Sequence, residues 1–153
     1  GLVSTGCLTV PSGASGGSGV SGASSKLISV FVQKFRYHGM PTTISAGVHS
    51  ILFQNRESFA ITHEMIPVAL PAGKTAKDLR AEAKAKGPDS EDEWLHIGGD
   101  FGPADTGASV VETLFLPPGT YAIACWQTGT PTGKQNGPTH ASLGMVFQFT
   151  VTS

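Results

Sequence analysis

Hydrophobic and polar positions alternate along much of this 153-residue chain with the period of two that β-strands produce. Runs rich in β-branched and aromatic residues are separated by Gly- or Pro-containing turns, as in proteins built from short strands. The predicted strands span residues 27–37, 42–54, 59–70, 110–116, 120–126 and 145–151, and breaks within them allow six to eight strands in all. Such a series predicts an all-β, Greek-key sandwich of two sheets.

Two of these segments carry more specific expectations. Alternation predicts that residues 27–37 form one strand with two different faces. These faces are lined by Val30 and Val32 on one side and by Phe31, Phe35 and Tyr37 on the other. Pro67 interrupts the segment 59–70, which predicts a sheet edge or a bulge there because proline cannot donate a ladder hydrogen bond.

One segment has helical rather than strand character. Residues 75–86 are rich in Ala and Lys, Thr75 and Asp78 have the spacing of a capping box, and Gly87-Pro88 is a helix stop. A second short turn is expected from Ser90, and it would bury Trp94. The sandwich therefore has a short helical insertion around residues 75–96.

Two further segments are expected to be loops. They are the Gly-rich residues 98–107 and the longer stretch 127–139 that follows the strand 120–126.

Composition supports a single folded domain and excludes some functions. The chain has 39% hydrophobic and 14% charged residues, with 20 Gly and 10 Pro, which is typical of strands joined by many turns. The net charge of −1 provides no basic field for nucleic acid. No run approaches the roughly 20 apolar residues of a membrane-spanning helix. We expect one domain, residues 26–153, and a monomer.

Residues 1–25 are expected to be a flexible leader or tether. From Ser12 to Ser25 every residue except Val20 is Gly, Ser or Ala. The first seven residues resemble the end of a bacterial lipoprotein signal, which would make Cys7 a lipid anchor; an ordinary exported or expression-derived tail is the alternative. A disulfide between Cys7 and Cys125 is not expected, since it would only fasten a tail.

The last part of the chain holds candidate metal ligands. Tyr121 and Cys125 lie four apart on one predicted strand and share a face. His140 and Met145 follow with the spacing H-x4-M, and His63 ends the upstream segment Phe59-Ala-Ile-Thr-His63. One thiolate, two imidazoles and a thioether form the ligand set of a trigonal copper site with a weak axial Met.

In these positions the sequence resembles the cupredoxins, the family of plastocyanin, azurin and pseudoazurin. The resemblance spans about Leu27 to Val151 and rests on Gly119, Tyr121, Cys125, His140 and Met145, with His63 upstream. It implies one copper ion bound by His63, Cys125, His140 and Met145. It also implies that His140 is the more exposed ligand, near the docking site of a partner, and that the backbone around Asn55 and Glu64 supports the ligand loop.

The sequence departs from the small electron-transfer members at one place. Fourteen residues separate Cys125 from His140, where those members have only a few. Loop length alone adds little entropy, but a long loop changes what covers the copper. It also leaves room for a collapsed or metal-free site.

Other chemistries are less well supported. Gly73-Lys74-Thr75 resembles the end of a phosphate-binding loop, but Val68 stands where the first Gly belongs. A Cys–His hydrolase would use Cys125 and His140, yet it lacks an evident third group. Binuclear copper centres and multicopper oxidases need a second Cys in the ligand loop or His-x-His pairs, which are absent from the sequence. We therefore expect no enzyme.

The favoured function is one-electron transfer between redox partner proteins by an extracytoplasmic copper protein. The alternatives are a copper carrier or store with the same ligands, and a metal-free sandwich that serves as a structural or interaction module. The remaining histidines have no comparable partners and are expected to be surface or structural residues: His38, His49 and His96.

Overall fold

The computed structural model describes residues 26–132 and 136–153. The expectations for residues 1–25, including a lipid anchor at Cys7, lie outside the described residues. The strands are β2 (Ile28–Gln33), β3 (Arg36–His38), β4 (Thr43–Ser45), β5 (Gly47–Asn55), β6 (Thr62–Ala69), β7 (Leu95–His96), β8 (Phe101–Asp105), β9 (Ser109–Leu116), β10 (Gly119–Ala124) and β11 (Val146–Thr152). The helices are α3 (Ala76–Lys86), the 3-10 helix η2 (Gly87–Glu93) and α4 (His140–Leu143).

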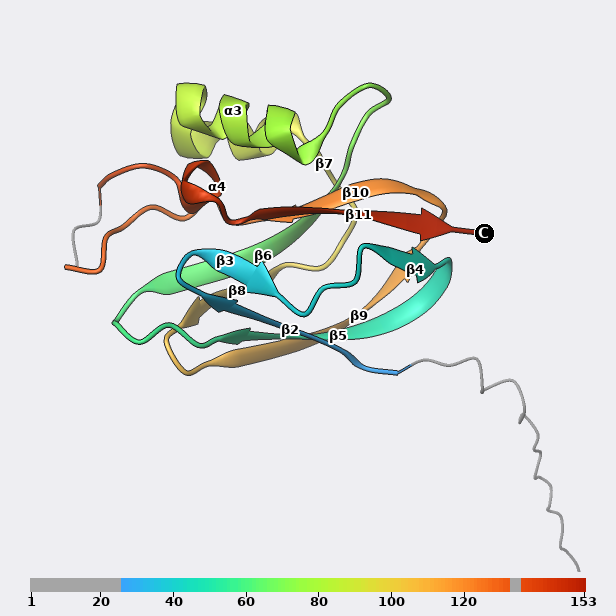
Figure 1. The fold of residues 1–153 in the computed structure, drawn as a ribbon, viewed down its shortest axis with the longest axis horizontal. Helices are drawn as coiled ribbons and strands as arrows, with labels where there is room; N and C mark the ends of the chain where they lie inside the picture. Colours follow the sequence, from blue (N-terminus) through green and yellow to red (C-terminus); the bar gives the residue numbers. More distant parts are fainter. Residues whose placement is uncertain (1–25, 133–135) are drawn as a thin grey trace, which may run out of the picture.

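The strands form two sheets that pack as a sandwich (Figure 1). One sheet has the order β3-β2-β5-β9. The other has the order β4-β11-β10-β6-β7, and β8 pairs with β6 outside this path. The chain passes repeatedly from one sheet to the other, for example from β5 to β6 and from β9 to β10. The predicted two-sheet sandwich with a helical insertion is confirmed.

Two hydrophobic clusters lie on opposite faces of the second sheet, and β10 contributes to both. Tyr121, Ile123 and Cys125 belong to the cluster between the sheets. Ala122, Ala124 and Trp126 belong to the cluster beneath α3, which also holds Leu79 of that helix. Successive side chains of a strand point to opposite faces, so the alternation of β10 carries Cys125 inward and Trp126 toward the helix.

The predicted helix is confirmed together with its capping box. The Thr75 side chain accepts from the Asp78 backbone N–H, and the Asp78 carboxylate accepts from the Thr75 backbone N–H at 2.8 Å. These bonds satisfy backbone donors that a helix start otherwise leaves without partners. The helix ends at Gly87, and Trp94, after η2, is buried as expected. The helix covers the face of the sheet that contains β10 (Figure 1).

The prediction of one strand across residues 27–37 was wrong. The chain reverses at Lys34 and Phe35, which have φ values of +54° and +57°, and continues as β3 antiparallel to β2. Tyr37 therefore returns to the buried face, in the same cluster as Val30 and Val32. A two-residue turn with positive φ at both positions normally carries Asn or Gly, and neither is present to signal it.

Two smaller expectations also need correction. The Gly-rich residues 98–107 are not all loop, because β8 forms there and pairs with β6. Pro67 lies within β6, neither at a sheet edge nor at the β-bulge, which falls between His63 and Met65. On the side away from β10, β8 pairs with β6 as far as Met65, and β7 pairs with β6 from Val68 onward. Pro67 therefore falls between these two short partner strands.

Candidate metal centre

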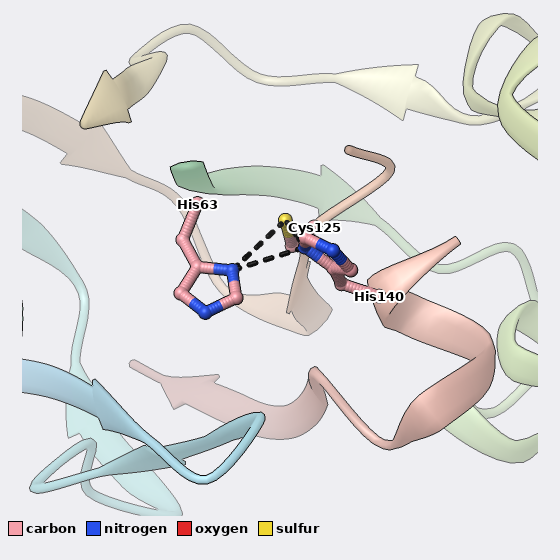
Figure 2. Close-up of side chains that lie close together, drawn as sticks. All are labelled: His63, Cys125 and His140. Atoms are coloured by element: carbon pink, nitrogen blue, oxygen red, sulfur yellow. Dashed lines mark hydrogen bonds between the residues drawn. The ribbon is translucent and has the colours of Figure 1, made fainter. Parts of the chain in front are cut away.

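Three side chains from distant parts of the chain converge at one end of the sandwich. His63 lies near the start of β6, Cys125 follows the end of β10, and His140 is the first residue of α4. Figure 2 shows their donor atoms turned toward one another. The Nδ1 atoms of the two imidazoles lie 3.0 Å apart, and Cys125 Sγ lies 3.5 Å from Nδ1 of His140 and 4.0 Å from Nδ1 of His63.

Backbone hydrogen bonds hold the His140 segment against the end of β10. The His140 N–H donates to Gln127 O at 2.8 Å, and the Ala141 N–H donates to Cys125 O at 2.7 Å. The Cys125 N–H in turn donates to Met145 O at 3.2 Å. Both ends of the long loop are thereby fastened beside the Cys125 side chain, so its length does not separate the two ligand candidates.

Hydrogen bonds at the far side of each ring determine which imidazole nitrogen faces the centre. Nε2 of His63 lies 2.8 Å from Glu57 Oε2, and Nε2 of His140 lies 3.1 Å from Gly129 O. A carbonyl or carboxylate oxygen only accepts, so each Nε2 carries the proton. In a neutral imidazole the other nitrogen then has a free lone pair. The Nδ1 lone pairs of His63 and His140 and the sulfur of Cys125 are therefore directed into the same space between the three side chains.

Burial keeps these groups uncharged when no ion is bound. All three side chains are fully buried, at 0% exposure. Desolvation lowers the pKa of His63, although its contact with Glu57 opposes this, and lowers the pKa of His140 to about 4. Desolvation also raises the pKa of the Cys125 thiol, and the nearby charge of Glu64 adds to this effect. A bound cation would displace the thiol proton and leave the imidazoles neutral, because metal ligands bind as thiolate and neutral imidazole.

Sequence reasoning missed Glu57, which is buried against the far side of His63. Its side chain has 0% exposure, and its carboxylate also accepts from the backbone N–H groups of Lys34 and Phe35. The only sequence signal is a carboxylate six positions before His63. The connecting residues 56–61 form neither helix nor strand, so no periodicity predicts the contact.

Comparison with solved structures identifies the fold. An auracyanin from Roseiflexus castenholzii is 20% identical, with 83% of this chain and 97% of that chain covered and a TM-score of 0.60. Auracyanin A, described as a blue copper protein from Chloroflexus aurantiacus, is 21% identical over 84% of this chain and 99% of that chain, with a TM-score of 0.53. Auracyanins are blue copper cupredoxins. The chain has the cupredoxin fold. No protein-family model and no curated protein sequence matches it.

Within this cupredoxin fold the donor set fits one copper ion. Imidazole nitrogens bind metals at about 2.0–2.1 Å and thiolates at about 2.3 Å, so three such donors around an ion in their plane lie about 3.6–3.8 Å apart. The two sulfur–nitrogen distances, 3.5 and 4.0 Å, lie on either side of that range, and the nitrogen–nitrogen distance of 3.0 Å is shorter than it. Two imidazoles and one thiolate in a trigonal arrangement are the ligands of cupredoxin copper.

The predicted exposure of His140 was wrong. His140 is fully buried, and its Nε2–H is bonded to Gly129 O in the long loop between Cys125 and His140. Phe35 also packs edge-on against the rings of His63 and His140, with centroid distances of 5.3 and 5.0 Å. The loop and this aromatic ring therefore cover the ligand edge that the resemblance to cupredoxins led us to expect at the surface.

Glu64 supports the cysteine segment as expected, whereas the contacts of Asn55 lie on β8 and on the segment that leads to His63. The Glu64 backbone N–H donates to Cys125 Sγ at 3.4 Å, and its carboxylate accepts from the N–H of Trp126 at 3.1 Å and from the amide of Gln127 at 3.2 Å. Asn55 donates its side-chain amide to two backbone carbonyls at 2.9 Å. Glu64 thus acts directly on the cysteine segment, and Asn55 braces the strands that lead to His63.

Proposed function

We propose that this protein binds one copper ion through His63, Cys125, His140 and Met145, and that it transfers single electrons between redox partner proteins. A copper ion held by these residues would supply one-electron chemistry, accepting an electron from a reduced partner and passing it to an oxidised partner. The observation that carries the proposal is the convergence of two Nδ1 lone pairs and a cysteine sulfur within 4.0 Å in a buried site.

Met145 is proposed as the weak axial ligand. Its side chain is fully buried in the same cluster as Cys125, and its backbone N–H donates to His140 O at 2.9 Å. These contacts, with the bond from the Cys125 N–H to Met145 O, support a role for Met145 next to the three converging side chains. A long thioether contact at this position helps to set the reduction potential of such sites.

Burial favours electron transfer over copper delivery. All three converging side chains are inaccessible to solvent, and Gly129 covers His140. A carrier must release its ion to a second protein, which would require the loop and Phe35 to move aside. An electron needs no such opening, and a rigid sandwich suits both oxidation states.

The remaining parts of the proposal concern the cellular location and the partners of the protein. Among the described residues, no helix is both long and apolar enough to cross a membrane. We propose that the protein works outside the cytoplasm, that its partners are redox proteins and that it catalyses no reaction of its own. These proposals on location and partners depend on the cupredoxin fold, which the likeness to auracyanin structures supports.

Copper titration with absorption spectroscopy tests the proposal. Addition of Cu(II) should produce an intense blue or green thiolate band that saturates at one ion per chain. Cys125→Ser should stay colourless, because a hydroxyl cannot replace the thiolate. His96→Gln is the matched control for the histidines, since His96 is exposed and lies outside the group. It should retain the band.

Two results would contradict electron transfer. Colourless protein that binds Cu(I) tightly would indicate a carrier or store. Protein that binds neither Cu(I) nor Cu(II) would indicate a metal-free structural or interaction module.

A further inference from the structure

We infer that Glu57 is a positioning residue that orients His63 toward the ion and favours Cu(II) over Cu(I). This inference rests on the proposed function. Neither the sequence pattern nor the likeness in fold points to Glu57. The inference follows from a series of buried contacts, through Glu57, between the β2–β3 turn and His63.

The first contact fixes the imidazole ring. Glu57 Oε2 lies 2.8 Å from Nε2 of His63, and both side chains have 0% exposure. With Nε2 donating to the carboxylate, only Nδ1 can bind a metal. A different orientation of the ring would break a buried charge-assisted hydrogen bond, and such bonds are about twice as strong as neutral ones.

The second contact fixes the carboxylate itself. The backbone N–H groups of Lys34 and Phe35 both donate to Glu57, and the Phe35 bond measures 3.0 Å. Successive N–H groups of a turn form an anion-binding concavity when they converge in this way. Together with His63, they give the carboxylate three donors on its two oxygens.

The conformation of the turn supports a specific role. Lys34 and Phe35 both have positive φ, at +54° and +57°, although neither is Gly, Asn or Asp. Such residues store of order 1–3 kcal/mol each and persist only where surrounding contacts hold them. The bonds to Glu57 are contacts of this kind. The turn also places the Phe35 ring against His63 and His140, so one element shields the site and anchors its carboxylate.

Charge determines the direction of the effect on copper. Glu57 adds a negative charge to those of the Cys125 thiolate and the nearby Glu64, and Cu(II) carries one more positive charge than Cu(I) to compensate them. Coulomb energies are larger in a buried, low-dielectric site than in water. Glu57 therefore stabilises Cu(II) more than Cu(I), which lowers the reduction potential of the copper.

Glu57→Gln tests this inference by removing the charge at nearly constant volume. We expect the Cu(II)-to-Cu(I) affinity ratio to fall tenfold or more, and for a one-electron couple each tenfold change is about 59 mV. Voltammetry of the copper-loaded variant measures the shift toward higher potential. Glu57→Asp keeps the charge and should shift the potential less. Glu93→Gln removes the same charge from a carboxylate that is 45% exposed, and it should leave the ratio within about twofold of wild type.

A second measurement uses the unmodified protein, in case Glu57→Gln does not fold. In the Cu(I) form, which is diamagnetic, NMR should show an Nε2 proton on His63 that exchanges slowly with solvent, and no proton on its Nδ1. An unshifted potential in folded Glu57→Gln, or a His63 without that protected proton, would overturn the inference. A wild-type protein without a copper–thiolate band would instead refute the proposed function, and this inference with it.

Discussion

The Nδ1 atoms of His63 and His140 lie 3.0 Å apart, although 77 positions separate the two residues in the chain. Both nitrogens face each other as acceptors, because each ring donates its proton on the opposite side, to Glu57 or to Gly129. The Cys125 thiol, whose sulfur lies 3.5 Å from His140 Nδ1, has one proton to donate and so can satisfy at most one of these two lone pairs. A buried acceptor without a donor is unfavourable. A cation bound between the two nitrogens would make the arrangement favourable. In the metal-free protein, keeping these nitrogens close together lowers the stability of the fold.

Copper should therefore stabilise the folded protein measurably. Free ligand at 100 times its dissociation constant adds about 2.7 kcal/mol to the unfolding free energy, provided that it binds only the native state. We expect calorimetry to show a higher melting temperature with one equivalent of copper, and a chelator should reverse the shift. Cys125→Ser should show a much smaller increase. An equal increase in that variant would place the copper at another site.

The metal-free protein should lose stability as the pH falls. Burial lowers the pKa of His140 to about 4 from its usual 6.5, so between these values the unfolded chain binds more protons than the folded chain. The contribution of His140 to the unfolding free energy is therefore complete above pH 6.5, and it is lost as the pH falls toward 4. The shift corresponds to roughly 3 kcal/mol.

Urea unfolding of metal-free protein at pH 7 and pH 4.5 checks this dependence. His140→Gln should lose less stability between these pH values than wild type, because its side chain does not titrate. His96→Gln, which replaces an exposed imidazole, should behave like wild type. Identical pH profiles for wild type and His140→Gln would show that His140 contributes nothing to the dependence.

The sequence predicted those parts of the site that lie on regular elements. Cys125 could be placed because alternation along β10 sets its face, and His63 because it lies in a strand-like segment. The contact between Glu57 and His63 could not be predicted. It depends on the irregular residues 56–61 and on a turn at Lys34 and Phe35 that lacks the usual Gly or Asn.

The errors in the fold have a related cause. The strand β8 was predicted as loop because its segment is Gly-rich, but pairing with β6 outweighs that local preference. The burial of His140 depends on where the long loop places Gly129 O, and loop paths are set by tertiary contacts rather than by composition. The role of Met145 as an axial ligand remains a prediction.

Phe35 should protect bound copper from solvent and chelators. Phe35→Gly removes the ring that packs on His63 and His140 and relieves the positive φ. Lys34→Gly relieves the same kind of strain at the neighbouring position and leaves the ring in place. We expect a strong chelator to remove copper at least about tenfold faster from Phe35→Gly, since 1.4 kcal/mol in a barrier is a factor of ten in rate.

Lys34→Gly is expected to keep the wild-type rate of copper loss and to change the unfolding free energy by less than about 1 kcal/mol. Stopped-flow measurement of the decay of the thiolate band compares the three proteins directly. If both variants lose copper equally fast, the turn conformation rather than the ring controls access.

Met145→Leu tests the proposed axial contact against a matched control in the same core. Leu and Met have similar volumes, so the substitution should reduce the unfolding free energy by less than about 1.5 kcal/mol. The substitution would remove the proposed thioether donor to Cu(II), so we expect the intense band to persist and the reduction potential to rise. Met65 is also fully buried in the cluster that contains Cys125. Met65→Leu should reduce stability to a similar extent without moving the potential, and equal potentials in the two variants would exclude Met145 as a ligand.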